Sequence, residues 1–155
     1  MDFSKFTLYG ARVQSLPGRW SLLAGVNGQY AFSDLLAPEL FAVGGEHFGR
    51  GYDPSEILSD HGVAGKVDLR YTHTWSGRRP MSLTPYGFVD AGRVWQRTTY
   101  PGIESSQDIV STGGGVYLNI GTQVSGYIEI AKPLTKDIWQ ERNREPRIFA
   151  GISIH

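Results

Sequence analysis

The sequence contains no cysteine, which excludes disulfides and thiolate-bound metals. It also lacks any run of about 18 apolar residues, so we expect no transmembrane helix. Basic and acidic residues number 15 each, and this balance gives no overall positive charge that would attract nucleic acid or an anionic membrane. The N-terminal stretch MDFSKFTLYG lacks the basic and apolar regions of a secretory signal, so we expect any export signal to lie outside this chain.

Glycine and aromatic residues, in contrast, are plentiful, with 20 glycines and 12% Phe, Trp and Tyr. Together with a hydrophobic period of two, this composition predicts β-strands joined by turns. The period is clearest in residues 62–76, where one face carries Val63, Val67, Leu69, Tyr71 and Trp75 and the other carries Lys66, Asp68, Arg70, Thr72 and Thr74. The same period sets Glu129 against Ile128 and Ile130, so we predict that Lys66, Asp68, Arg70 and Glu129 share the polar face.

A soluble β-sandwich would also alternate, because its apolar faces share one core. Two features favour a transmembrane β-barrel instead. The predicted strands at 19–33 and 62–76 are much longer than the usual strand of about 5–6 residues. Aromatic residues also lie near the ends of the apolar faces, as in the aromatic girdles of membrane barrels.

The predicted connections alternate in length along the chain. Short turns at 16–18, 76–80 and 120–123 alternate with long loops at 34–61, 99–109 and 133–146. This alternation is typical of the periplasmic turns and extracellular loops of outer-membrane barrels. It predicts seven antiparallel strands, near 3–15, 19–33, 62–76, 81–97, 109–120, 123–132 and 146–155. Seven strands leave two open sheet edges, so we expect either a piece of a larger barrel or self-association of the fragment.

Two motifs carry a family resemblance. The stretch GGEHFGRGYDPSEI, residues 44–57, is followed by an Asp-His-Gly step into a strand, and YGFVDAG occupies residues 86–92. With their flanking segments they resemble the two-partner secretion transporters of the ShlB/FhaC/HecB haemolysin secretion/activation type, within the wider superfamily of the assembly insertase BamA. The chain departs from that pattern at Gly49, at Ser59, and in ending on His155 where an aromatic residue is usual.

The resemblance implies that residues 1–155 are the last seven strands of an outer-membrane barrel of roughly sixteen, without the periplasmic POTRA domains. It implies that 34–61 is an extracellular loop that re-enters the lumen, with Gly49, Arg50, Gly51 and Tyr52 at its tip. The implied anchor is Asp90, which shares a strand face with Phe88 and Gly92. The implied function is a pore that secretes a partner exoprotein of the haemolysin or adhesin type, with no catalysis and no cofactor. A BamA-like assembly factor and a small soluble β binding domain are the alternatives.

Other interpretations of the same residues stay open at this point. Arg50 could be a solvated loop charge, and Asp68 and Glu129 could compete with Asp90 for it. The runs Gly44-Gly45 and Gly113–Gly115 could suggest phosphate cradles, but no Gly-Lys-Ser/Thr follows either of them. The four histidines show no ligand spacing, so we expect no metal site.

Overall fold

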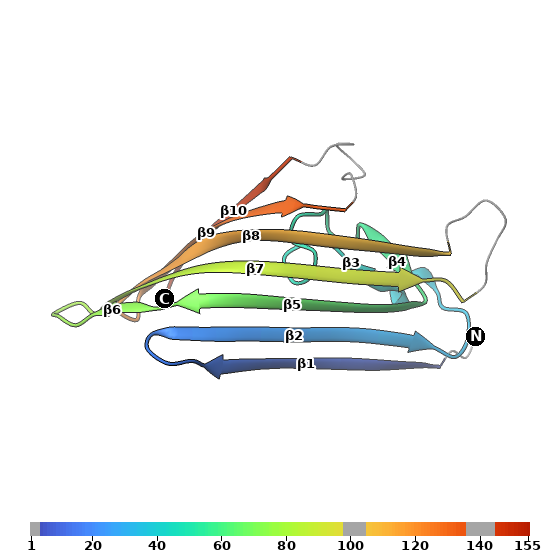
Figure 1. The fold of residues 1–155 in the computed structure, drawn as a ribbon, viewed down its shortest axis with the longest axis horizontal. Coiled ribbons are helices and arrows are strands. Elements are labelled where there is room, and N and C mark those ends of the chain that lie inside the picture. Colours follow the sequence, from blue (N-terminus) through green and yellow to red (C-terminus); the bar gives the residue numbers. More distant parts are fainter. Residues whose placement is uncertain (1–3, 98–104, 136–144) are drawn as a thin grey trace.

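The computed structural model describes residues 4–97, 105–135 and 145–155, and the fold is all-β (Figure 1). The long strands form one antiparallel sheet in the order β1-β2-β5-β7-β8-β9-β10, so the prediction of seven strands is confirmed. Their bounds are β1 Lys5–Ser15, β2 Trp20–Ala31, β5 His61–Tyr71, β7 Met81–Trp95, β8 Ser106–Ile120, β9 Val124–Pro133 and β10 Arg147–Ile154. Within the described residues the sheet is not closed, because β1 and β10 each pair on one side only.

The structure corrects several predicted boundaries. The strand expected at 62–76 is interrupted at Thr72, and its end is the separate strand β6, His73–Trp75, which pairs only with β7. In the described part of the chain no second strand pairs with β6, because β2 begins only at Trp20. Strand β8 begins three residues earlier than expected. The other long loops, predicted at 99–109 and 133–146, lie partly outside the described residues.

The two faces of the sheet differ sharply in burial. Asp68 and Glu129 are buried on one face, called the inner face below, whereas Val67 and Ile128 are 46% and 64% exposed on the outer face. Antiparallel register carries this alternation from strand to strand, since Lys66 pairs with Asp90 and Val67 with Val89. The outer face is therefore a broad exposed apolar surface. Among the described residues no helix is long and apolar enough to cross a membrane.

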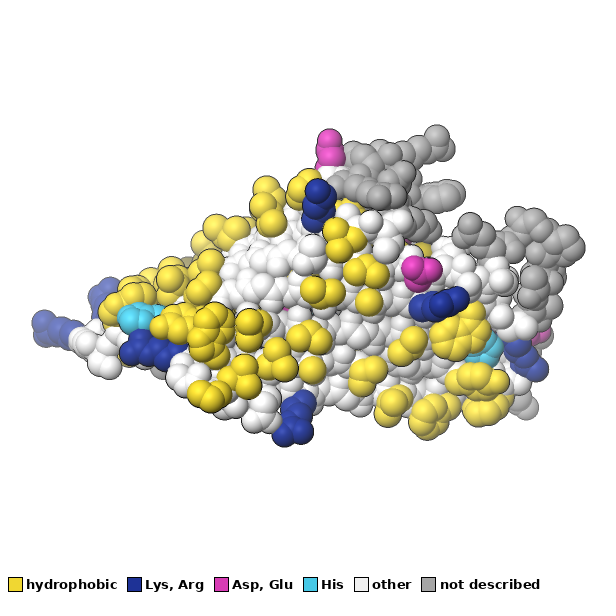
Figure 2. Space-filling model, in the orientation of Figure 1, with side chains coloured by type: hydrophobic (Ala, Val, Ile, Leu, Met, Phe, Trp, Pro, Cys, Tyr) yellow, Lys and Arg dark blue, Asp and Glu magenta, His cyan; other side chains and the backbone are white. Residues whose placement is uncertain are grey.

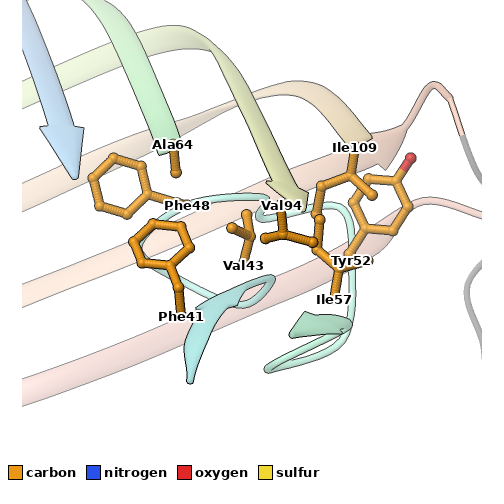
Figure 3. Packing of buried hydrophobic residues seen from close by; sticks show 8 residues of the cluster. All are labelled: Phe41, Val43, Phe48, Tyr52, Ile57, Ala64, Val94 and Ile109. Atoms are coloured by element: carbon orange, nitrogen blue, oxygen red, sulfur yellow. The ribbon is translucent and has the colours of Figure 1, made fainter. Parts of the chain in front are cut away.

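The connection between β2 and β5 lies against the inner face, and it is more ordered than the irregular loop predicted for 34–61. It contains a 3-10 turn, Ala37–Glu39, and a small hairpin of β3, Phe41–Val43, and β4, Ile57–Ser59. Its apolar side chains pack on the sheet, as Figure 3 shows. This core comprises Phe41, Val43, Phe48, Tyr52 and Ile57 from the loop, with Ala64, Val94 and Ile109 from β5, β7 and β8. The loop and the inner face thus share one hydrophobic core, which fixes the loop on the sheet.

Candidate functional site

Arg50 lies at the tip of the loop, and glycines produce the turn that places it there. Gly44, Gly45 and Gly49 have φ of 125°, 95° and 80°, a region that residues with a Cβ rarely adopt. The Tyr52 N–H donates to the Gly49 carbonyl at 2.9 Å and closes the turn around Arg50. The backbone therefore presents the Arg50 side chain and its own N–H to the sheet together.

Asp90 of β7 receives both groups. The Arg50 Nε donates to Asp90 Oδ2 at 2.9 Å and Nη2 donates to Oδ1 at 2.8 Å, which is a bidentate pair. The backbone N–H of Arg50 also donates to Oδ2 at 3.0 Å. Both residues are nearly inaccessible, with Arg50 4% exposed and Asp90 0%. The contact that the family resemblance implies is thus present in the structure.

Asp68 and Glu129 do not compete with Asp90, because one guanidinium binds all three carboxylates. The Arg50 Nη2 donates to Asp68 Oδ1 at 2.7 Å, and Nη1 donates to Glu129 Oε2 at 3.2 Å. Arg70 donates to the second oxygen of Asp68 at 3.0 Å. We call these five residues, Arg50, Arg70, Asp68, Asp90 and Glu129, the anchor cluster. It holds two guanidinium groups and three carboxylates, drawn from the loop and from β5, β7 and β9.

Phe88 completes the environment of the guanidinium. The Arg50 Cζ lies 3.4 Å from the centre of the Phe88 ring, at cation–π distance. Burial alone would lower the pKa of Arg50, but its hydrogen bonds and charge contacts with Asp90 and then Asp68 outweigh burial and raise that pKa above its usual value. The group therefore stays charged, and its charge is balanced by fixed carboxylates.

Glycines on the inner face make room for the loop. A Cβ at Gly92 would lie 2.5 Å from Val43, and one at Gly62 would lie 2.0 Å from Phe41. A Cβ at Gly115 would lie 2.7 Å from the Tyr86 hydroxyl, which donates to Glu129. Gly113 and Gly115 thus let the rings of Phe88 and Tyr86 lie across β8, so that the cluster reaches β9. Sequence reasoning missed this role, although the signal was present as glycines at inward-facing positions.

The loop is also tied to both edge strands. Lys5 of β1 pairs with Glu39 at 2.7 Å, and Arg147 of β10 pairs with Asp53. The Tyr52 hydroxyl accepts from the Thr135 N–H at 3.1 Å, just beyond β9. These ties were not predicted from the sequence. The loop therefore contacts the first and the last strand of the sheet as well as its middle.

Lys66 lies on the inner face but outside the anchor cluster. Its Nζ lies 5.3 Å from the centre of the Phe48 ring. Beside it a cavity of about 280 Å³ opens between the loop and β5, β8, β9 and β10; its lining includes Glu46, His47, Tyr117, Tyr127 and Phe149. Among the described residues no group of three or more His, Asp or Glu could hold a metal ion.

The fold and site define a class: an antiparallel sheet with an apolar outer face, whose inserted loop places one buried arginine among carboxylates of the inner face. The family described as haemolysin secretion/activation protein ShlB/FhaC/HecB matches residues 1–118. The chain belongs to this family, whose members are outer-membrane transporters of two-partner secretion.

Curated relatives are similar to the chain at low identity. Two are heme/hemopexin transporter proteins HuxB, one from Haemophilus influenzae strain ATCC 51907 / DSM 11121 / KW20 / Rd and one from Haemophilus influenzae. Each is 26% identical over 141 residues, covering 87% of this chain and 25% of the relative. The chain thus spans about a quarter of their length. No solved structure matches the chain.

Proposed function

We propose that this chain forms the C-terminal wall of an outer-membrane pore that secretes a partner exoprotein, with the loop at 34–61 lying in the lumen. The observation that carries the proposal is the buried anchor cluster, which ties the loop tip to β5, β7 and β9 at once. In this arrangement the inner face lines the conduit, the outer face contacts lipid, and the short turns face the periplasm.

The properties of the two faces support a membrane barrel over a soluble sandwich. Outward residues such as Val67, Val89 and Ile128 are exposed rather than packed against a second sheet. A tilted strand needs ~9–11 residues to cross a bilayer. Each long strand exceeds this length or comes close to it. Exposed aromatic side chains lie near both ends of this surface, among them Trp20 and Trp75 at one end and Tyr30 and Phe32 at the other.

The anchor has a clear mechanical role in such a pore. Ordering a glycine-rich loop costs about 1–2 kcal/mol of backbone entropy per residue, and a buried bidentate pair offsets part of that cost with a fixed direction. A tethered loop keeps its position in the lumen both during translocation of a substrate and between translocation events. The protein therefore acts through positioning, and the proposal includes no catalytic step and no cofactor.

Secretion measurements on the transporter that contains this chain test the proposal. We expect Arg50→Ala and Asp90→Ala each to abolish release of the exoprotein while insertion of the barrel, followed by heat-modifiable mobility on gels, is largely retained. Lys66→Gln is a matched control, because it removes the inward cation on the strand next to Asp90, and the ion pairs of the anchor cluster among the described residues do not include Lys66. Normal secretion by Asp90→Ala, or equal loss in Lys66→Gln, would contradict the proposed role.

The family indicates the general class of the cargo. A two-partner system implies one secreted protein partner, and the haemolysin or adhesin type is our expectation from the resemblance. Two relatives are named heme/hemopexin transporter proteins. We therefore include exoproteins that handle heme or hemopexin in the proposed class of cargo. Mass spectrometry of the proteins released into the culture medium, with and without the transporter, identifies the cargo directly.

A further inference from the structure

The short-turn end of the sheet carries a segregated positive charge that the balanced composition conceals. Turns 16–19, 76–80 and 121–123 contain Arg19, Arg78 and Arg79 and no Asp or Glu. The loop at the opposite end, residues 32–60, contains six carboxylates and one arginine. Among the described residues no carboxylate pairs with any of these three arginines.

The arginines adjoin a belt of aromatic side chains on the outer face. Trp20 and Tyr71 are cross-strand partners whose rings meet edge to face at 5.1 Å, and the rings of His73 and Trp75 meet at 4.3 Å. The Arg19 guanidinium also contacts the Nδ1 of His73. Figure 2 shows this end, where basic side chains and a histidine adjoin a cluster of hydrophobic ones. We call Arg19, His73, Arg78 and Arg79, with Trp20, Tyr71 and Trp75, the basic rim.

This arrangement fits a phospholipid headgroup. Tryptophan and tyrosine concentrate at the level of the headgroups, because one end of each ring is apolar and the other polar. Cations directly beyond such a belt lie at the depth of the lipid phosphates, and guanidinium groups bind phosphate oxygens in a fork. A solvated patch of arginines would need no neighbouring aromatic belt, and a patch that binds another protein would not need to follow the boundary of the apolar face.

We propose that the basic rim binds the headgroup phosphates of anionic phospholipid in the leaflet that surrounds the short turns. The inference rests on the proposed placement of the barrel in a membrane, and it adds a lipid preference to that placement. Headgroup binding holds the short-turn end at a fixed depth while the loop end remains free to act. Each arginine that binds a headgroup should raise the preference for an anionic lipid about five-fold.

Fluorescence quenching by brominated lipids measures this preference. The full-length transporter is reconstituted in mixtures of phosphatidylcholine and phosphatidylglycerol in which either one lipid or the other is brominated. The signal of Trp20 and Trp75 is isolated as the difference from a Trp20→Phe/Trp75→Phe variant. We expect a several-fold preference for phosphatidylglycerol over phosphatidylcholine at this rim, decreasing with added salt.

A charge-removal variant and a matched control decide the outcome. Arg19→Gln/Arg78→Gln/Arg79→Gln should bring the preference to near unity, whereas Arg93→Gln, an exposed arginine on the outer face at the other end of β7, should leave it unchanged. Equal quenching by both lipids in the wild type, or an unchanged preference in the triple variant, overturns the inference. No quenching by any brominated lipid contradicts the membrane placement itself, so failure of the proposed function is recognised separately.

Discussion

At the residue scale, the anchor cluster depends on the fork geometry of one guanidinium. We expect Arg50→Lys to restore only part of the secretion that Arg50→Ala loses, because an ammonium cannot reproduce the parallel bonds to both oxygens of Asp90. Removing one partner of a buried pair costs about 3–5 kcal/mol. Arg50→Ala already removes the bonds to all three carboxylates, whereas Asp90→Ala leaves the guanidinium with Asp68 and Glu129, so the double variant Arg50→Ala/Asp90→Ala should be no worse than Arg50→Ala alone. Secretion assays on the four proteins check this, and full activity of Arg50→Lys would show that charge alone suffices.

Gly92 tests the packing of the loop separately from its charges. A Cβ at this position would lie 2.5 Å from Val43, so we expect Gly92→Ala to push the β3–β4 hairpin off the sheet and destabilise the fold by about 1–3 kcal/mol. Urea unfolding of the refolded protein in detergent measures the change. Gly77→Ala is the matched control, because no atom of the described residues lies within 4 Å of the Cβ it would add. Equal urea unfolding midpoints for the Gly92→Ala and Gly77→Ala variants would mean that the loop does not pack against Gly92.

At the element scale, the pair between Asp53 and Arg147 connects the loop to the edge strand β10. The second oxygen of Asp53 is buried with no hydrogen-bond partner among the described residues, so this carboxylate depends on Arg147. We expect Arg147→Ala to destabilise the protein by about 1–3 kcal/mol, since it leaves a buried carboxylate unpaired. Asp53→Ala/Arg147→Ala should recover part of that loss.

A double-mutant cycle in unfolding free energy measures this coupling. The pair between Lys5 and Glu39 is the control, because its side chains are more exposed and such pairs contribute only about 0.2–1 kcal/mol. A coupling for Asp53 and Arg147 no larger than that of the control would show that the loop is not held by β10.

The elements also show what a sequence can predict. A period of two predicted the long strands and their faces, since any slip in register would turn Val67 inward and Asp68 toward the apolar side. The β3–β4 hairpin was not predicted, because strands of three residues are too short to show a period. The Asp53–Arg147 pair joins positions 94 apart in sequence, and no local pattern connects them. Arg50 and Asp90 were paired only through the family motifs.

The inner-face charges illustrate the same limit. Alternation predicted the side of the sheet on which Asp68, Arg70 and Glu129 lie, but the sharing of one guanidinium by three carboxylates depends on the depth of the loop. That depth is set by Phe41 against Gly62 and Val43 against Gly92, contacts between segments that are distant in the chain. Packing of this kind becomes visible only in three dimensions.

At the scale of the whole molecule, the sheet formed by the described residues has two unpaired edges and an apolar outer face. Ile128, Ile148 and Ile152 are exposed there, the last at 80%. Unpaired strand edges form hydrogen bonds with other chains, and large apolar patches associate in water. We therefore expect the isolated 155-residue chain to aggregate or to require detergent, rather than to behave as a soluble monomer.

Size-exclusion chromatography with light scattering checks this expectation, with and without detergent. The informative comparison is a variant with Val67, Val89 and Ile128 replaced by Thr, which lowers the apolarity of the outer face but keeps β-propensity and both edges. If the face drives association, this variant should be less dependent on detergent than the wild type. If the edges drive it, the two proteins should form the same large species in water. A monodisperse wild-type monomer of 17.2 kDa without detergent would contradict both explanations and would favour a soluble binding domain over a membrane barrel.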